Sequence, residues 1–209
     1  LIGHWIILAL ILCWFIYMGG YIHNLQNRVR DQRENLRDAH SRLEAIAVRD
    51  DLTGLYNRRH FLERLEEELS LANRNHTPLY LAIIDLDHFK RVNDNYGHHS
   101  GDEVLSRFAR IASQGLRKSD LLARYGGEEF VVLFPHATEA ACEAALERLR
   151  SRFAEQDYPF ADDVITTFSA GLTAFQPGET ANQLIKRADS ALYEAKSRGR
   201  NQLVQLPLS

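Results

Sequence analysis

Two glycines followed by two glutamates, Gly126-Gly127-Glu128-Glu129, lie between short apolar runs at residues 121–123 and 130–134. Apolar runs of strand length on both sides of a Gly-Gly turn are typical of a tight β-hairpin. Glycine allows a backbone turn with positive φ or a close approach to a ligand, and adjacent carboxylates are suitable ligands for Mg²⁺. Taken alone, the stretch favours a solvated turn, so its function depends on the rest of the chain.

The elements expected around this hairpin alternate between helices and strands. Helices are expected at residues 58–74, 138–153 and 182–197, and the turn residues of 93–101 separate two further helical pieces. Strands are expected at residues 79–85, 164–175 and 203–206. This order predicts an α/β fold with a mixed central β-sheet flanked by helices. Small residues at Ser169-Ala170-Gly171 leave room for a close neighbour, and residues 49–59 predict a structured corner.

The first 22 residues contain no Asp, Glu, Lys or Arg and are mostly aliphatic or aromatic. This length is enough for a transmembrane helix, and a signal peptide fits poorly because no basic region precedes the run and no cleavage site follows it. Four arginines follow the run, at positions 28, 30, 33 and 37. The positive-inside rule then predicts a single span in the inner (cytoplasmic) membrane with the rest of the chain in the cytoplasm. Because the chain begins at Leu1 within this run, we expect that a larger sensor protein continues N-terminally.

Residues 23–48 contain a heptad pattern about three repeats long. Its seam consists of Leu25, Val29, Gln32, Leu36, Ala39, Leu43 and Ile46. The pattern favours a parallel coiled-coil stalk that joins two copies of the chain as a homodimer. A single amphipathic helix packed on its own domain is the alternative. The remaining residues, 49–209, are expected to form one globular domain.

The composition excludes some classes of function. The formal net charge is −3 and 25% of the residues are charged, so no basic excess indicates nucleic-acid binding. The two cysteines, Cys13 and Cys142, lie far apart in very different surroundings, which argues against a disulfide framework or a zinc site.

Asp85 follows the apolar run of residues 79–84, as an acid at the end of a buried strand does. If the hairpin lies beside this strand, Asp85, Glu128 and Glu129 converge at one sheet edge. Convergent carboxylates repel each other unless a cation joins them, and hard oxygen ligands favour Mg²⁺ or Mn²⁺ over Zn²⁺. Taken singly, Asp85 is equally well explained as a cap of the following helix, and for Asp87 the capping role is favoured.

Further polar residues are candidates for contacts with a nucleotide. The candidate phosphate ligands are Lys90, Arg124, Lys196 and Arg200, each of which is more often a solvated charge when taken alone. Asn93 and Asp102 offer oxygens that accept from a guanine edge, although either also fits a helix cap or a loop. Arg117 and Asp120 are spaced to grip a second guanine and phosphate, and the alternative is a surface ion pair.

Together, these motifs resemble the GGDEF-domain diguanylate cyclases over about residues 48 to 206. The stretch from Gly126 to Phe130, preceded by Arg124-Tyr125, is similar to the family signature in its variant with Glu in third place. The other matching motifs are Asp50-Asp51-Leu52-Thr53-Gly54-Leu55, Asn57-Arg58-Arg59, Asp85-Leu86-Asp87-His88-Phe89-Lys90, Asn93-Asp94, Gly97-His98, Gly101-Asp102, Asp189-Ser190-Ala191-Leu192-Tyr193, Ala195-Lys196 and Gly199-Arg200-Asn201.

The resemblance implies condensation of two GTP molecules into cyclic di-GMP and pyrophosphate, on a fold like the palm of class III nucleotide cyclases. Each subunit of a dimer would hold one GTP. Two Mg²⁺ ions, or Mn²⁺, would be held by Asp85, the carbonyl of Leu86, Glu128 and Glu129. The resemblance further implies the catalytic candidates Glu128, Glu129, Arg124 and Lys196, and the substrate-binding candidates Phe89, Lys90, Asn93, His98, Asp102, Lys196 and Arg200.

Arg117 and Asp120 match the inhibitory product site of the same family, so cyclic di-GMP is expected to inhibit the enzyme. The acidic side chain of Asp102 favours guanine over other bases. A non-catalytic receptor that binds GTP or cyclic di-GMP and signals through the stalk is the alternative. The intact Asp85, Glu128, Glu129 and Lys196 favour the enzyme.

Overall fold

The computed structural model describes residues 48–160 and 166–206, together with single positions at 14, 18, 19, 26, 28, 30 and 33. The chain divides into two units, residues 1–47 and 48–209, and the fold described below is that of the second unit. The predicted membrane span and coiled-coil stalk lie almost entirely outside the described residues. Among the residues that are described, no helix is both long and apolar enough to cross a membrane.

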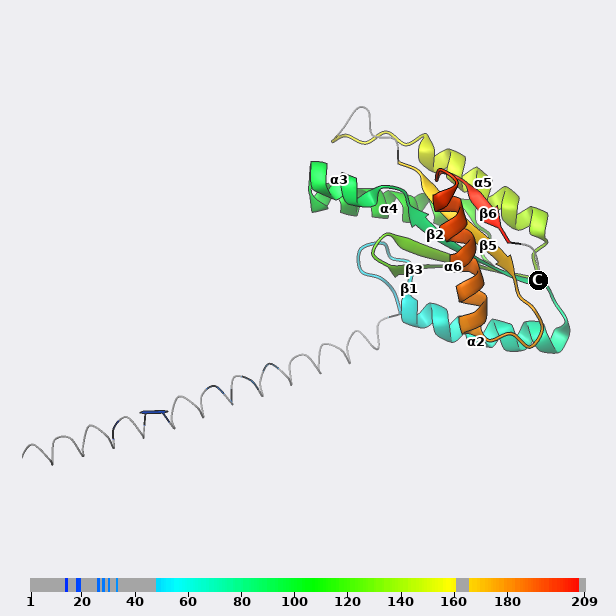
Figure 1. Cartoon of the computed structure of the whole chain (residues 1–209), viewed down its shortest axis with the longest axis horizontal. Coiled ribbons are helices and arrows are strands. Elements are labelled where there is room, and N and C mark those ends of the chain that lie inside the picture. The colour runs from blue at the N-terminus through cyan, green and yellow to red at the C-terminus, as the bar shows by residue number, and fades with distance from the viewer. Residues whose placement is uncertain are drawn as a thin grey trace, which may run out of the picture. The chain divides into compact units, whose positions relative to one another are not determined.

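A six-stranded mixed sheet forms the centre of the domain, with the strand order β1-β3-β4-β2-β5-β6 (Figure 1). The strands are β1 (Tyr56–Asn57), β2 (Leu79–Leu86), β3 (Leu121–Gly126), β4 (Glu129–Pro135), β5 (Phe168–Ala174) and β6 (Leu203–Gln205). The two outer pairs, β1–β3 and β5–β6, are parallel, and the inner pairs are antiparallel. The expected mixed sheet is therefore present, with β2 between β4 and β5.

Helices cover both faces of this sheet. They are α2 (Arg58–Asn75), α3 (Phe89–Tyr96), α4 (His98–Gly115), α5 (Glu139–Ala154) and α6 (Ala181–Ser197). Helices α3, α4 and α5 pack on one face around Phe108 and Phe153, whereas α2 and α6 pack on the other face around Phe61 and Leu184 (Figure 1). The α/β fold predicted from the sequence is thus confirmed for the described residues.

The central strand explains why its sequence is apolar at nearly every position. Ala82 and Ile84 belong to the core beneath α4 and α5, while Leu81 and Ile83 belong to the core beneath α2 and α6. A strand that is buried on both faces needs apolar residues at successive positions rather than at alternate ones. The polar end of β2, from Asp85 onward, is the point where the strand leaves this double core.

Polar caps fix where the helices begin. Asn57 accepts a hydrogen bond from the backbone N–H of His60 at the start of α2, and Thr138 does the same for α5. Thr180 and Gln183 form a reciprocal capping box at the start of α6. Each cap satisfies backbone donors that the first helical turn leaves unpaired, which is why these helices begin close to their predicted positions.

Three expectations about the elements require correction. Gly97 alone separates α3 from α4, so the turn-forming residues at 98–101 lie inside a helix. Strand β5 begins at Phe168 rather than at residue 164, and residues 161–165 are outside the described part of the chain. The predicted corner at residues 49–59 also contains β1, a two-residue strand that pairs with β3.

Gly171 in β5 determines how closely α6 approaches the sheet. A Cβ atom at this position would lie 2.2 Å from both Ala188 O and Leu192 N. Only glycine permits this backbone-to-backbone contact, so the small patch predicted to admit a close neighbour does so. The consequence is that the C-terminal end of α6 lies near the polar end of β2.

Candidate active site

The register between β2 and β4 brings two candidate carboxylates together. Asp85 is the direct cross-strand partner of Glu129. The backbone N–H of Leu86 donates to the carbonyl of Glu128 at 3.3 Å, which ties the hairpin tip to the same strand end. Gly127, with φ of 51°, supplies the left-handed conformation that the turn between β3 and β4 requires. The predicted convergence of the hairpin with the end of β2 is therefore present.

Lys196, in the last turn of α6, reaches this edge. Its Nζ lies 2.8 Å from Asp85 Oδ2, and the two side chains are 32% and 13% exposed, respectively. This contact depends on the close packing of α6 at Gly171. Lys196 therefore pairs with Asp85, and the carboxylates of Glu128 and Glu129 are close enough to influence the same edge electrostatically.

Burial, and to a smaller extent neighbouring carboxylates, raise the pKa of both Asp85 and Glu129. Burial raises the pKa of Asp85, the Lys196 ammonium opposes that rise, and the carboxylates of Glu128 and Asp87 add to it. Burial also raises the pKa of Glu129, with further increases from Asp85, Asp189 and Glu128 against the opposing charge of Lys196. An added cation would relieve the repulsion that raises both pKa values.

The donor types at this edge fit a hard divalent cation. The oxygens come from carboxylates on neighbouring strands. The ammonium of Lys196 forms an ion pair with Asp85, where a bound metal ion would also interact. In the described part of the chain, no three His, Cys, Asp or Glu side chains form a ready-made metal cluster. The donor types thus match the chemistry of Mg²⁺ binding, although the described side chains are not gathered into a metal cluster and Asp85 pairs with Lys196 instead.

The candidate guanine-binding residues lie where α3 packs against α4. A Cβ atom at Gly101 would be 2.0 Å from Asn93 Oδ1 and 3.1 Å from the ring of Phe89. Glycine at this position thus lets Asn93 lie directly against the backbone that precedes Asp102. Phe89 is buried beneath this contact, whereas Lys90, His98 and Asp102 are exposed. The structure brings Asn93 and the Gly101-Asp102 segment together, and their role in binding guanine stays a prediction.

Arg200 does not continue the face of α6 that carries Lys196. The helix ends at Ser197, and the next turn has φ values of 113° at Gly199 and 67° at Arg200. The four-residue spacing of Lys196 and Arg200 is therefore not an i, i+4 helical pair. The backbone bends at Gly199, after the end of α6.

Arg124 connects the hairpin tip to the beginning of the domain. Its Nε and Nη2 donate to the carbonyl of Gly127 at 3.0 and 2.9 Å, and its Nη1 donates to both carboxylate oxygens of Asp50 at 3.2 and 3.1 Å. Asp50 also accepts from the backbone N–H and the hydroxyl of Thr53. These contacts give Arg124 a role in holding the hairpin, and its phosphate-binding role stays a prediction.

Neither Asp85 nor Asp87 caps α3, which corrects that interpretation. The residue at the N-terminal boundary of α3 is His88, which makes no side-chain capping bond. Asp87 is 8% exposed and accepts hydrogen bonds from Thr167 Oγ1 and Ser169 Oγ, both at 2.7 Å. It therefore joins the end of β2 to β5 instead.

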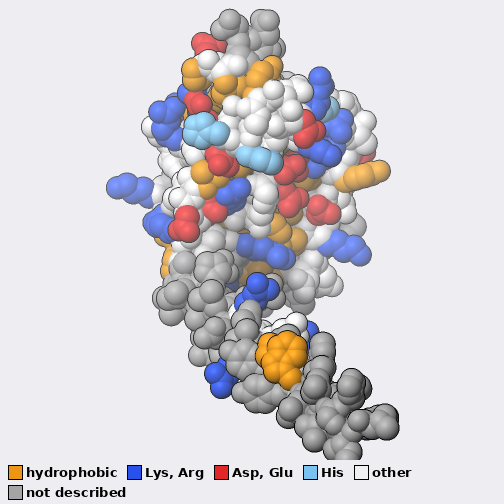
Figure 2. Space-filling model, turned by 90° about the vertical axis from the view of Figure 1, so that its left-hand side faces the viewer, with side chains coloured by type: hydrophobic (Ala, Val, Ile, Leu, Met, Phe, Trp, Pro, Cys, Tyr) orange, Lys and Arg blue, Asp and Glu red, His pale blue; other side chains and the backbone are white. Residues whose placement is uncertain are grey.

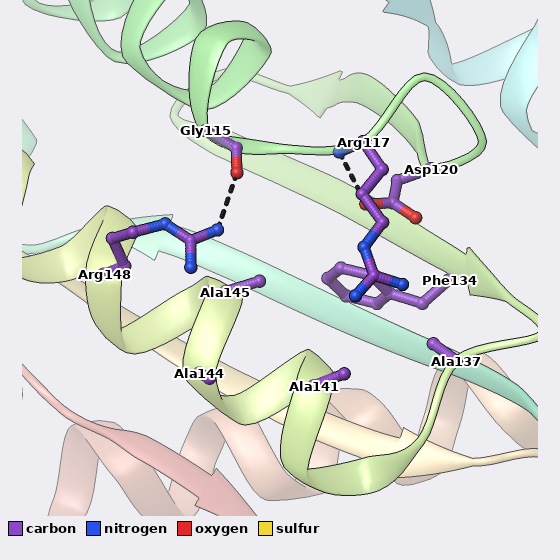
Figure 3. Close-up of a pocket in the computed structure, with 9 residues that line it drawn as sticks. All are labelled: Gly115, Arg117, Asp120, Phe134, Ala137, Ala141, Ala144, Ala145 and Arg148. Atoms are coloured by element: carbon purple, nitrogen blue, oxygen red, sulfur yellow. Dashed lines mark hydrogen bonds between the residues drawn. The ribbon is translucent and has the colours of Figure 1, made fainter.

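A pocket of about 140 Å³ lies away from this edge, between α5, the end of α4 and β4 (Figure 3). Arg117 and Arg148 extend over its floor, which contains Phe134 and several alanines of α5. Asp120 accepts from the backbone N–H of Arg117 at 2.9 Å, and Arg148 Nη2 donates to the carbonyl of Gly115 at 2.9 Å. The pocket therefore presents two exposed guanidinium groups beside one carboxylate. Sequence reasoning identified Arg117 and Asp120 but missed Arg148.

The face of the domain drawn in Figure 2 carries charges of both signs. On the face drawn in Figure 2, acidic, basic and histidine side chains are interspersed rather than separated into patches. This pattern agrees with the small net charge of −3.

Residues 47–202 match the family described as "Diguanylate cyclase, GGDEF domain". The chain belongs to the GGDEF-domain family. Over 190 residues, it is 43% identical to the protein named Diguanylate cyclase DgcP from Pseudomonas aeruginosa, and over 163 residues it is 40% identical to Response regulator PleD from Caulobacter vibrioides. These alignments cover 89% and 76% of this chain, but only 28% and 36% of the relatives.

Solved structures share this GGDEF fold. The coiled coil and GGDEF domain of DgcB from Caulobacter crescentus, in complex with c-di-GMP, superpose with a TM-score of 0.75 at 31% identity. That match covers 87% of this chain and 99% of the crystallised DgcB fragment. Diguanylate cyclase SiaD of Pseudomonas aeruginosa, in complex with its activator SiaC, matches with a TM-score of 0.74 and 38% identity over 93% of this chain and 76% of SiaD.

In this GGDEF domain, the family's defining motif is the turn between β3 and β4 together with the first residues of β4. The turn places Glu128 beside Leu86, and the first ladder position of β4 places Glu129 opposite Asp85. The motif is therefore a way of placing acids at the end of a buried strand.

Proposed function

We propose that the chain is a diguanylate cyclase that condenses two GTP molecules into cyclic di-GMP. The 3′-hydroxyl oxygen of each GTP bonds to the α-phosphorus of the other, and pyrophosphate leaves from each. The main support is the cross-strand pair of Asp85 and Glu129 beside Lys196 within a GGDEF domain. The 43% identity to a protein named as a diguanylate cyclase supports the same reaction.

Asp85, Glu128, Glu129 and the carbonyl of Leu86 would hold two Mg²⁺ ions, with Mn²⁺ as an alternative. When bound, the metal would lower the pKa of the 3′-hydroxyl and neutralise charge that develops on the phosphoryl group. The cross-strand pairing of Asp85 with Glu129 supports this proposal, because it brings two carboxylates to one sheet edge, where a cation would relieve their repulsion.

The residues of the chain have separate tasks in this reaction. Glu129 would accept the proton of the 3′-hydroxyl, because its carboxylate lies opposite Asp85 at the same sheet edge. Asn93 and Asp102 would accept hydrogen bonds from the guanine edge, with Phe89, Lys90 and His98 around them. Lys196 and Arg200 would bind the terminal phosphates. Because each subunit holds one GTP, two subunits must face each other.

The dimer would form through the coiled coil of residues 23–48. The similarity to DgcB covers 87% of the chain, which is more than residues 48–209 represent, and the matched DgcB fragment contains a coiled coil. This extension into the first unit supports a stalk. The uncharged residues 1–22 would anchor the dimer in the inner membrane, with the GGDEF domain in the cytoplasm, on the basis of the sequence alone.

Cyclic di-GMP would inhibit the enzyme from the pocket of Arg117, Asp120 and Arg148. Two guanidinium groups suit the two phosphates of the product, and Asp120 suits a guanine edge. The DgcB structure in complex with c-di-GMP supports product binding by a related domain. The same pocket is what favours the second candidate function, a receptor that binds cyclic di-GMP without making it.

Incubation of the full chain with GTP separates the two candidates. We expect cyclic di-GMP, identified by mass spectrometry, when Mg²⁺ or Mn²⁺ is present. We expect none after chelation with EDTA, and recovery when Mg²⁺ is restored. A folded dimer that binds cyclic di-GMP but forms none from GTP under these conditions would establish the receptor and contradict the enzyme.

A further inference from the structure

The turn that follows α6 has a backbone conformation that side chains disfavour. Gly199, Arg200 and Asn201 all have positive φ values, of 113°, 67° and 47°. Glycine adopts such values without strain, but two successive residues with side chains do so only where the surrounding structure holds them. The strain falls on the segment that carries Arg200, the proposed phosphate ligand.

Buried Asp87 holds this turn from the side of the sheet. Its Oδ2 accepts a hydrogen bond from the backbone N–H of Asn201 at 3.0 Å and from Thr167 Oγ1 at 2.7 Å. Its Oδ1 accepts from Ser169 Oγ at 2.7 Å. Because three donors from two other segments converge on one carboxylate, the backbone at Asn201 is fixed relative to the ends of β2 and β5.

Arg150 of α5 holds the same residue through other atoms. Its Nη1 donates to the backbone carbonyl of Asn201 at 3.2 Å and to Asn201 Oδ1 at 2.9 Å. Asn201 is therefore held by hydrogen bonds at its N–H, its carbonyl and its side chain. The backbone N–H of Arg200 also donates to the carbonyl of Ala195, which ties the turn to α6.

These contacts connect the turn to the reacting edge. Asp87 is two residues beyond Asp85, which pairs with Lys196 in the last turn of α6. The end of β2 thus holds α6 through Asp85 and the turn after α6 through Asp87. We propose that Asp87, Arg150 and Asn201 are positioning residues that hold Arg200 in its left-handed conformation for contact with the triphosphate of GTP. This proposal rests on the proposed function, because that function supplies the triphosphate.

A positioning role and a purely structural role predict different effects on ligands with and without phosphates. A positioning network for Arg200 affects the binding of phosphates and leaves the binding of the base unchanged. A general support of the fold affects both. The effect of an Arg150 substitution on phosphate binding must also depend on Arg200, so it must disappear when the Arg200 side chain is removed.

Arg150 is the best position for a test, since its side chain is 26% exposed and its loss does not open the core. The full chain and its Arg150→Ala variant are titrated by calorimetry with α,β-methylene-GTP, which cannot transfer its α-phosphate, and with guanosine, which has no phosphate. Glu147→Gln is the matched control, because Glu147 pairs with Arg150 at 2.8 Å on the solvent side but does not contact the turn.

We expect Arg150→Ala to weaken binding of the triphosphate about fivefold, and to change binding of guanosine by less than about twofold. Glu147→Gln should change neither by more than about twofold. In the Arg200→Ala background, adding Arg150→Ala should have almost no further effect, as coupling through one residue requires. Equal weakening of both ligands, or a full effect that persists without Arg200, would overturn the proposal.

The wild-type chain separates this proposal from the proposed function. If it binds the triphosphate more tightly than guanosine but forms no cyclic di-GMP, the enzyme is contradicted while the comparison of variants still decides the role of Arg150. If it binds the two ligands equally, no phosphate contact exists for Arg200 to make, and the positioning role is wrong.

Discussion

The edge of β2 and β4 and the Arg117 pocket both combine carboxylates with basic side chains, but their charges balance in opposite ways. At the edge, Lys196 pairs with Asp85, which lies close to Glu128 and Glu129, and burial raises the pKa values of Asp85 and Glu129. In the pocket, backbone and hydroxyl donors satisfy Asp120, while the guanidinium groups of Arg117 and Arg148 are exposed.

The difference in charge indicates which kind of ligand each region is suited to bind. The edge lacks positive charge and is suited to a divalent cation with its nucleotide. The pocket has an excess of positive charge and is suited to an anion such as a phosphodiester. Under the proposed function, one domain would bind the substrate and the product of one reaction at separate places, because the two ligands compensate opposite charges. Substitutions that alter one region should leave the other unchanged.

The largest effect is expected from Glu129→Gln at the edge. The substitution keeps the shape of the side chain but removes both its charge and its ability to accept a proton. Turnover of GTP should fall about 100-fold or more, as typically follows the loss of one group that acts on transition-state charge. Thermal stability should be retained, because the change also removes repulsion between this side chain and Asp85.

Cyclic di-GMP formation and thermal unfolding measure these two effects, with exposed Glu66→Gln on α2 as the control. Binding of cyclic di-GMP to the Arg117 pocket should be the same in Glu129→Gln as in the unaltered chain. Wild-type turnover in Glu129→Gln would show that this carboxylate takes no part in the reaction. Weakened product binding would show that the two regions are not independent.

The expected effect in the pocket is smaller and leaves turnover intact. Arg117→Ala and Arg148→Ala should each raise the cyclic di-GMP concentration needed for half inhibition about tenfold, since each removes a charged hydrogen-bond donor. Initial rates measured before product accumulates should not change. Lys118→Ala, in the same turn as Arg117, is the control.

Inhibition curves with added cyclic di-GMP distinguish the two arginines. If Arg117→Ala loses inhibition but Arg148→Ala does not, the pocket binds product through the Arg117-Asp120 turn alone. If neither variant changes the curve, the pocket is not an inhibitory site. Its excess of positive charge then has no role in inhibition by cyclic di-GMP.

The parts of this design that depend on local sequence could be predicted, and those that depend on packing could not. The apolar run ending at Asp85, the glycines of the hairpin and the small residue Gly171 each carry a local signal that the structure bears out. Arg148 carries none, because it reaches the pocket only through the packing of α5. The partners of Asp87 are 80 and 114 residues away in sequence at Thr167 and Asn201, beyond any local pattern.

The smallest effect is expected from Asp50→Asn, which weakens the support of the hairpin by Arg124. Burial raises the pKa of Asp50, but hydrogen bonds from Thr53 and the charge of Arg124 outweigh this and leave the pKa below its ordinary value. The ionised carboxylate therefore stabilises the folded state at neutral pH. Because both side chains are partly exposed, the loss in Asp50→Asn should be about 1 kcal/mol, with turnover reduced only a few-fold.

The dependence on pH provides a sharper test of the same contact. A carboxyl group whose pKa is lower in the folded state contributes stability above its unfolded pKa and loses it as pH falls through the folded value. The ordinary pKa of an Asp side chain is 3.8, so the unaltered chain should lose more stability than Asp50→Asn when the pH falls from about 5 to about 3. Urea unfolding at the two pH values measures the difference. Identical losses would mean that Asp50 is not held as an anion by Arg124, and the hairpin would then depend on the bonds from Arg124 to Gly127 alone.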